Sequence, residues 1–205
     1  MNKNNYIILK QAVAPEICDL IAEYARLQAS VKPKIHKRGD PLAYIHRAYA
    51  DPLMETLLLR LTPKVEEALQ CELWPTLSFY YTYAKGNELN KHKDRSSCEF
   101  VAGLYIAADP QFTQNEGSWP LCLDLEGKEE KIALNSGDLV IFKGHEVLHW
   151  REKFTGQWCV SAIFGYVDKN GPFAFQKFDQ RKSIGLPHIG MLRWSFGCLI
   201  NKLRR

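Results

Sequence analysis

The chain has 205 residues, which is long enough to bury a hydrophobic core and typical of a single domain. Hydrophobic residues make up 46% and charged residues 24%, so the composition excludes a disordered chain. The net charge of +4 is too small to indicate nucleic-acid binding by itself. No apolar run approaches the roughly 20 residues of a membrane-spanning helix, and the N-terminal residues lack the apolar segment of a signal peptide.

The cysteine pattern indicates a reducing compartment. Six cysteines are scattered along the chain without a Cys-x-x-Cys pair, and several lie in strand-like segments. Isolated cysteines of this kind are commonly buried thiols rather than disulfide partners. We therefore expect a cytoplasmic protein with reduced thiols at Cys18, Cys71, Cys98, Cys122, Cys159 and Cys198.

The N-terminal part is predicted to begin with a strand and a helix. Residues 6–9 are aromatic, β-branched or aliphatic, which predicts a strand. Pro15 follows, and proline is favoured in the first turn of a helix because its missing N–H has no partner there. Apolar residues then recur at helical spacing, at Ile17, Leu20, Ile21 and Tyr24.

Two more helices are predicted after a loop. Residues 30–50 are basic and irregular, which indicates a loop. Asp51 and Pro52 supply an N-cap and a proline at the first helical position, so a second helix is expected to begin there. Pro63 follows a threonine and repeats this start signal, which predicts a third helix near 63–70.

The second half of the chain is predicted to be β-rich. Short runs of strand-forming residues are separated by turn residues such as Gly86 and Gly137. Helices followed by many short strands indicate an α+β, mainly β domain, a barrel or sandwich with helices on one outer face. The helical part covers about 14–70 and the β core about 76–168. The expected strands are 76–83, 100–107, 120–125, 131–134, 138–142 and 159–167.

The C-terminal residues form a separate segment. We expect one domain over 1–184 and a basic, apolar tail over 185–205. The tail could be an amphipathic helix that contacts a membrane or a partner. Alternatively, it could dock on its own domain, which is the commoner fate of an apolar stripe.

Histidine and carboxylate residues in two segments predict a metal site. His92 and Asp94 are two positions apart, so both side chains point to the same side of an extended chain. His145 and His149 follow the predicted strand 138–142. Two histidines and one carboxylate form the facial triad that binds Fe(II) and leaves positions open for a bidentate co-substrate and O₂. A structural zinc site would favour closely spaced cysteines.

Loop spacing favours His149 over His145 as the third ligand. The chain must leave the strand that ends at Phe142, turn at Gly144 and enter the next strand. His149 lies seven residues after Phe142, which allows this turn, whereas His145 lies only three residues after it. We therefore predict a site with His145 at its rim and with the ligands His92, Asp94 and His149. The alternative is a set of structural histidines without a metal.

The order of these motifs resembles the 2-oxoglutarate and Fe(II)-dependent oxygenases, in their prolyl-hydroxylase-like branch. The resemblance runs from Tyr6 to about Asp179. It rests on the opening YIILKQAVAPEICDLI, the stretch FYYTYAKGNELNKHKD with its His-x-Asp motif, SGDLVIFKGHEVLHWREKF with the distal histidine, and the late strand WCVSAIFGYV. The family implies a double-stranded β-helix (jelly roll) with supporting helices at the N-terminal side.

The resemblance also implies a reaction. Family members use Fe(II), 2-oxoglutarate and O₂, with ascorbate as a supporting reductant, and release succinate and CO₂. The expected activity is hydroxylation of an unactivated C–H bond in a peptide, an amino acid or a small metabolite. Asp94 favours hydroxylation, because the halogenating relatives replace this carboxylate with a small residue. Tyr83 matches a tyrosine that lies close to the bound oxo-acid, and Tyr105 matches one that in some members reaches its distal carboxylate. Alternatively, both tyrosines simply fill the core of the barrel.

The expected cation for the far carboxylate of 2-oxoglutarate is missing. The family usually places Arg or Lys about ten residues after the distal histidine, where this chain has Trp158 and Cys159. A buried carboxylate needs a counter-charge, and Arg151 can grip it through two parallel hydrogen bonds. The alternative is a surface Arg151 paired with Glu152. Lys143 is a weaker candidate.

Other functions stay open at this point. A cupin-like metal protein would not use 2-oxoglutarate, and a non-catalytic binding module could attach to a membrane through 185–205. Substrate specificity is expected in loops over the barrel mouth, at 30–50, 95–99 and 108–119. The first loop is basic and could attract an acidic partner. The sequence contains no signal for a particular oligomeric state.

Overall fold

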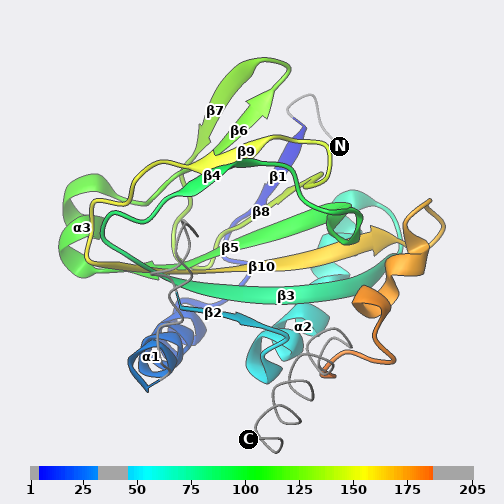
Figure 1. Ribbon diagram of the computed structural model, residues 1–205, viewed down its shortest axis with the longest axis horizontal. Coiled ribbons are helices and arrows are strands. Elements are labelled where there is room, and N and C mark those ends of the chain that lie inside the picture. The colour runs from blue at the N-terminus through cyan, green and yellow to red at the C-terminus, as the bar shows by residue number, and fades with distance from the viewer. Residues whose placement is uncertain (1–4, 32–45, 187–205) are drawn as a thin grey trace, which may run out of the picture.

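The computed structural model describes residues 5–31 and 46–186. Two antiparallel sheets face each other, and two long helices lie below the larger sheet (Figure 1). The helices are α1 (Pro15–Val31), α2 (Pro52–Leu69) and α3 (Pro110–Glu116), with 3₁₀ segments η1 (Ser96–Cys98) and η2 (Ala174–Gln180). The strands are β1 (Tyr6–Leu9), β2 (His46–Tyr49), β3 (Leu73–Ala84), β4 (Leu89–His92), β5 (Phe100–Ala108), β6 (Leu121–Leu125), β7 (Lys128–Ile132), β8 (Leu139–Phe142), β9 (His149–Arg151) and β10 (Trp158–Asp168).

The sheets form the jelly roll that the sequence predicted. The larger sheet has the order β1-β8-β5-β10-β3-β2, and the smaller one has the order β4-β9-β6-β7. Neighbouring strands are often distant in the chain, as in the pairing of β1 with β8. The mainly β class and the N-terminal supporting helices are confirmed, and each predicted strand overlaps an observed one.

Two hydrophobic cores lie on the two faces of the larger sheet. The first lies between this sheet and the helices α1 and α2, and includes Ile21, Leu58 and Tyr80. The second lies between the two sheets, and includes Tyr83 and Phe142. Successive residues of a strand point to opposite faces, so each long strand supplies both cores. This alternation points Tyr83 into the space between the sheets.

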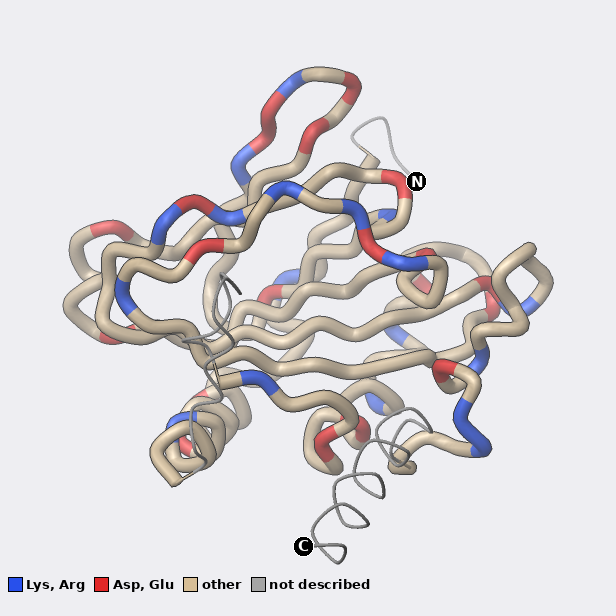
Figure 2. Tube along the Cα trace, in the orientation of Figure 1, with Lys and Arg blue, Asp and Glu red and all other residues tan. Residues whose placement is uncertain are grey.

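Charged residues are concentrated away from the central strands. β3 and β5 contain no charged residue, and β10 contains one, at its last position. Figure 2 shows Lys, Arg, Asp and Glu gathered in turns, at strand ends and in the β6–β7 hairpin. Charged side chains placed between the sheets would lose hydration, so a buried ionisable residue there needs a specific reason.

The prediction of a third helix near 63–70 is wrong. α2 runs without interruption through Pro63. Its start is as predicted: the Asp51 side chain accepts a hydrogen bond from the Leu53 N–H at 3.0 Å, and Pro52 follows. Pro63 cannot donate to the carbonyl of Leu59, but Leu59 faces solvent with its side chain half exposed, so water can satisfy that carbonyl. Burial of the opposite helix face outweighs the local start signal.

The predicted loops contain regular structure. Residues 46–49 of the predicted loop 30–50 form the edge strand β2, while 32–45 lie outside the described residues. The loop 108–119 contains α3, whose N-cap Asp109 accepts a hydrogen bond from the Phe112 N–H at 2.9 Å. Asp109 and Pro110 repeat the start signal of α2, so the sequence held information about this helix.

Several expectations concern the termini and the compartment. Residues 187–205 lie outside the described part of the chain, so a separate tail over 185–205 stays a prediction. Among the described helices, none is both long and apolar enough to cross a membrane. The five cysteines within the described residues are free, as predicted.

Candidate metal centre

Two neighbouring strands bring the predicted ligands together. After β3, the turn at Gly86 leads into β4, which ends at His92, and Asp94 follows two residues later. After β8, a turn leads into β9, which begins at His149. In the antiparallel pairing of β4 with β9, His92 lies directly opposite His149. Register therefore places both histidines beside Asp94, although they are far apart in sequence.

The side chains converge on one point. One ligand atom each from His92, Asp94 and His149 lies within 4.8 Å of the others. The Nε2 atom of His92 is 3.5 Å from Oδ1 of Asp94, and Nε2 of His149 is 3.6 Å from Oδ2. The two imidazole ring centres are 4.2 Å apart. His149 is buried, while the side chain of His92 is 38% exposed, so the site opens on the His92 side.

Backbone carbonyls orient both imidazole rings. Nδ1 of His92 is 2.8 Å from the carbonyl oxygen of Asn90, and Nδ1 of His149 is 3.0 Å from that of Val147. A carbonyl only accepts hydrogen bonds, so each Nδ1 carries a proton, and in the neutral ring Nε2 keeps its lone pair. Histidines that bind metals are commonly held in this way. Both lone pairs are then available to one ion.

The carboxylate of Asp94 has an unused acceptor. Its Oδ2 atom is buried and has no hydrogen-bond partner among the described residues, which is rare for a carboxylate. The Asp94 N–H donates to the carbonyl of Gly144 at 2.9 Å. A Cβ atom at Gly144 would lie 2.5 Å from Oδ2, so only glycine allows this approach. A divalent cation bound by Oδ2 and the two Nε2 atoms would satisfy all three groups, so these residues fit Fe(II).

The two histidines have opposite pKa shifts. The hydrogen bond with Asp94 raises the pKa of His92, whereas burial lowers the pKa of His149. His149 is therefore neutral near pH 7 and can donate its lone pair. Asp94 and His92 attract each other in the absence of a cation, and a metal ion would replace the proton between them.

Arg151 lies in the same cavity as the three candidate ligands. The cavity has a volume of about 80 Å³ between the two sheets. Arg151 is 8% exposed, donates a hydrogen bond to the carbonyl of Trp119, and stacks 4.9 Å from the ring centre of that residue. Glu152 instead pairs with Lys131 at 3.0 Å, so the alternative of a surface Arg151 paired with Glu152 is wrong. No described carboxylate neutralises Arg151.

The two predicted tyrosines differ in their relation to the cavity. Tyr83 lines it and packs edge-on against Trp119, with ring centres 4.9 Å apart. Burial raises the pKa of Tyr83 to about 12, so its hydroxyl stays protonated and can donate. Tyr105 is also buried, and its hydroxyl has no partner in the described structure, but it does not line the cavity.

His145 and Lys143 lie outside the cluster. Nδ1 of His145 is 3.2 Å from the carbonyl oxygen of Glu99, and its ring packs edge-on against Phe173 at 5.0 Å. Lys143 pairs with Glu146 at 3.0 Å and does not line the cavity with Arg151. The structure thus brings His149, and not His145, to the other two candidate ligands.

Sequence reasoning missed several residues around the centre. Gly144 determines how closely the backbone approaches Asp94, and its position between two predicted strands was the available signal. Tyr81 and Ser161 also line the cavity, and only strand alternation indicated them. The sequence also contained no signal for the contact between Arg95 and Asp179.

The fold has known counterparts among solved structures. No sequence-family model matches the chain, and no curated protein matches it in sequence. A prolyl-4-hydroxylase from Pseudomonas putida superposes with a TM-score of 0.58 at 17% identity, over 81% of this chain and 94% of the other. The non-heme epimerase SnoN, in complex with Fe³⁺, α-ketoglutarate and nogalamycin RO, gives 0.65 at 11% identity, over 90% and 88%.

A third counterpart was solved with a peptide. A prolyl hydroxylase from Trichoplax adhaerens, in complex with a peptide fragment of hypoxia inducible factor, superposes with a TM-score of 0.59 at 15% identity, over 82% of this chain and 86% of the other. The chain therefore has the fold of the 2-oxoglutarate and Fe(II)-dependent oxygenases, and the likeness extends over most of its length.

Proposed function

We propose that this chain is an Fe(II)- and 2-oxoglutarate-dependent oxygenase that hydroxylates an unactivated C–H bond. The convergence of two Nε2 lone pairs on a buried carboxylate oxygen without a partner carries this proposal. His92, Asp94 and His149 are the proposed ligands. The bound ion, with 2-oxoglutarate and O₂, supplies the oxidation and releases succinate and CO₂.

The chain itself supplies orientation and charge. The carbonyls of Asn90 and Val147 hold the two imidazoles in the tautomer that a cation requires. Arg151 offers a buried cation without an acidic partner, so it suits the far carboxylate of the oxo-acid. Tyr83 lines the same cavity and can donate its hydroxyl proton to an anionic ligand. Tyr105 does not line this cavity, but its buried hydroxyl has no hydrogen-bond partner among the described residues, so it is also proposed to donate to the oxo-acid.

The substrate is proposed to be a small molecule or a peptide side chain. The structural counterparts include one solved with a peptide fragment and one solved with nogalamycin RO. The exposed side of His92 is where such a substrate would approach. A cytoplasmic location is part of this proposal, supported by the five free cysteines among the described residues. A supporting role for ascorbate stays a prediction.

Anaerobic titration tests the proposed function. Purified protein is mixed with Fe(II) and then with 2-oxoglutarate, and visible absorption is recorded. A weak charge-transfer band near ~500 nm is expected when an oxo-acid chelates iron at an open coordination face. The band should be absent in His149→Ala and present in His145→Ala. Iron binding without a band would contradict the use of 2-oxoglutarate and would favour a cupin-like metal protein.

A further inference from the structure

An apolar stripe runs along α1, which lies below the larger sheet (Figure 1). Ile17, Leu20, Leu27 and Val31 are 45%, 59%, 61% and 67% exposed. Together with Tyr24 they recur at intervals of three and four residues, which is the spacing of the seam through which a second helix packs in a coiled coil. The buried residues of α1 lie on a different face, towards the larger sheet. α1 therefore has one apolar face in the core and a second one at the surface.

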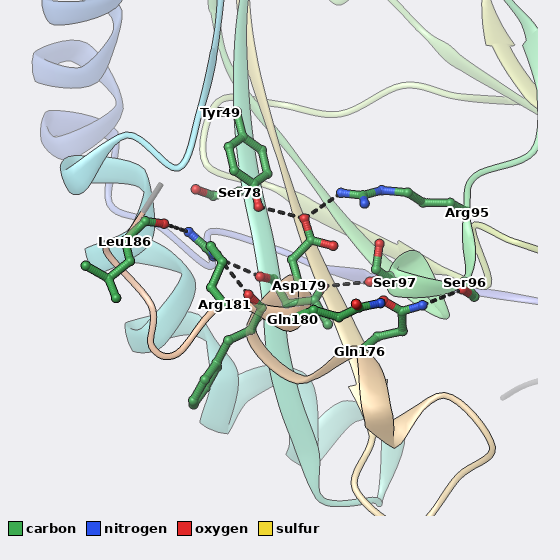
Figure 3. Close-up of polar contacts among 12 residues, drawn as sticks. Tyr49, Ser78, Arg95, Ser96, Ser97, Gln176, Asp179, Gln180, Arg181 and Leu186 are labelled. Atoms are coloured by element: carbon green, nitrogen blue, oxygen red, sulfur yellow. Dashed lines mark hydrogen bonds and ion pairs between the residues drawn. The ribbon is translucent and has the colours of Figure 1, made fainter. Parts of the chain in front are cut away.

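The last described residues are linked to this stripe through the start of α2. The carbonyl of Leu186 accepts a hydrogen bond from Nη1 of Arg181 at 2.8 Å, as Figure 3 shows. Arg181 also binds Glu55 in the first turn of α2, one turn after the N-cap Asp51. Oδ2 of Asp51 accepts a hydrogen bond from the Tyr24 hydroxyl at 2.6 Å. A short series of direct contacts therefore leads from residue 186 to the middle of the stripe.

The sequence that follows residue 186 has a matching pattern. In the 19 residues 187–205, apolar side chains recur at the same intervals of three and four, at Ile189, Leu192, Phe196, Leu199 and Leu203. A helix of 19 residues is about 28 Å long, and the 17 residues of α1 span about 25 Å. The segment is therefore long enough to lie along the whole stripe.

Charge favours this segment over a second copy of α1 as the occupant of the stripe. α1 carries three exposed acidic residues, Glu16, Asp19 and Glu23, whereas its one arginine, Arg26, stacks on the ring of Trp158 at 4.4 Å. Two copies of α1 would bring acidic residues together, and like charges across an interface are unfavourable. The segment 187–205 contains four Lys or Arg residues and no Asp or Glu. Its charge is thus complementary to that of α1.

We propose that residues 187–205 dock as a helix on the exposed apolar stripe of α1 in the same chain. Gly190 and Gly197 disfavour this helix in isolation, so it would form as the segment docks. The short path from Leu186 to Tyr24 gives the segment a high effective concentration at its own α1, which favours docking within one chain. Docking removes the exposed apolar side chains of α1 from water.

Hydrogen–deuterium exchange of the full-length protein tests this docking. The backbone amides of 187–205 should exchange at least about tenfold more slowly than those of an unstructured peptide, because a docked helix protects its N–H groups. The double variant Leu20→Gln with Leu27→Gln keeps the side-chain size and the helix propensity but removes the apolar surface. Exchange of 187–205 should then become about tenfold faster than in the wild type.

Phe175→Gln is the matched control. Phe175 is 65% exposed, much like Leu20 and Leu27, but it lies in η2 and not on α1. This variant should keep the slow exchange of 187–205. Equal loss of protection in the control and in the α1 variant would overturn the proposal, because the protection would then not depend on the stripe.

A change within the segment decides if the α1 variant does not fold. Phe196→Gln with Leu199→Gln alters only residues outside the described fold. Hydroxyl-radical footprinting should then show faster oxidation of Leu20 and Leu27 than in the wild type, because the docked helix no longer covers them. Unchanged oxidation of both leucines would contradict docking on α1.

Three further results would each overturn the proposal. The first is exchange of 187–205 in the wild type that is as fast as in an unstructured peptide. The second is protection that increases with protein concentration, which would indicate docking between two copies. The third is protection that requires vesicles of phosphatidylserine and phosphatidylcholine, which would assign the segment to a membrane surface. None of these results bears on the proposed metal centre, so the two proposals are tested separately.

Discussion

Three carboxylates with buried oxygen atoms have contrasting partners. Glu55 accepts hydrogen bonds from Arg181, Ser78 and the Gly185 N–H, and Asp179 accepts two on one oxygen. The Oδ2 atom of Asp94 accepts none from the described residues. A satisfied carboxylate indicates a structural role, whereas a buried acceptor without a partner marks the place where a ligand completes the site. The chain thus separates its stabilising charges from the carboxylate that is available for binding.

The largest expected effect is the loss of metal affinity when a proposed ligand is removed. His149→Ala removes an oriented Nε2 lone pair and should weaken Co(II) or Fe(II) binding by about 100-fold or more. His145→Ala removes a ring that contacts Glu99 and Phe173, so binding should change by less than about threefold. Isothermal titration calorimetry under anaerobic conditions measures both variants. Similar losses of metal affinity in the two variants would contradict the prediction, made from loop spacing, that His149 and not His145 is the ligand.

On the structural side, the expected effect is a loss of stability. Glu55→Gln leaves Arg181 buried without its counter-charge and should lower the free energy of unfolding by about 3–5 kcal/mol. Metal affinity should stay near that of the wild type, because Glu55 does not contact the 95–98 loop. Urea denaturation and Co(II) titration of the same preparation check both statements. A Glu55→Gln protein that is as stable as the wild type but binds metal more weakly would contradict the structural role of Glu55.

Arg151 tests whether the cavity binds an anion. Arg151→Ala removes the buried cation and should raise the half-saturating concentration of 2-oxoglutarate by about 30-fold or more, at nearly unchanged metal affinity. Lys131→Ala, on the edge strand β7 of the smaller sheet, is the control and should have no effect. The charge-transfer band near ~500 nm gives the readout. An unchanged requirement for 2-oxoglutarate would place the carboxylate site elsewhere.

The smallest expected effect concerns acid stability. Burial raises the pKa of Asp138, but hydrogen bonds from Lys10, Gln11 and Asn135 outweigh it, so the net pKa lies below the ordinary value of 3.8. The folded state therefore binds fewer protons, and this contribution to stability is present above about pH 4 and is lost as pH falls through the lowered pKa. Asp138→Asn should be about 1 kcal/mol less stable at pH 6, since Lys10 is largely exposed and adds little.

Denaturant unfolding at several pH values measures this prediction. The difference between Asp138→Asn and the wild type should shrink as the pH falls from 5 towards 2, because protonation removes the advantage of the wild-type carboxylate. A difference that stays constant over this range would mean that shape, and not charge, determines the contribution of Asp138.

The sequence predicted the architecture where local patterns and burial agree. Three patterns point to the observed layers: the run of strand-forming residues from 76 to 83, the helix start at Asp51 and the order of helices before strands. It failed at Pro63, where packing of α2 against the larger sheet overrides a local start signal. It also failed at Asp109, where the start signal of α3 was present but was assigned to a loop.

The candidate site was predictable in its ligands but not in its surroundings. Residue types and spacing singled out His92, Asp94 and His149, which the structure brings within 4.8 Å. The sequence could not indicate that Asp179 lies against Arg95, because 84 residues separate them and only the tertiary fold joins them. It also could not indicate that Trp119 packs against Arg151, for the same reason.

The register that pairs His92 with His149 has a consequence for how the chain unfolds. These residues belong to β4 and β9 of the smaller sheet, which are far apart in sequence. An ion bound by both would cross-link the two segments and close a long loop, much as a disulfide would in an oxidising compartment. Loss of the ion would remove that cross-link, so proteases should cut the metal-free protein more readily around the smaller sheet.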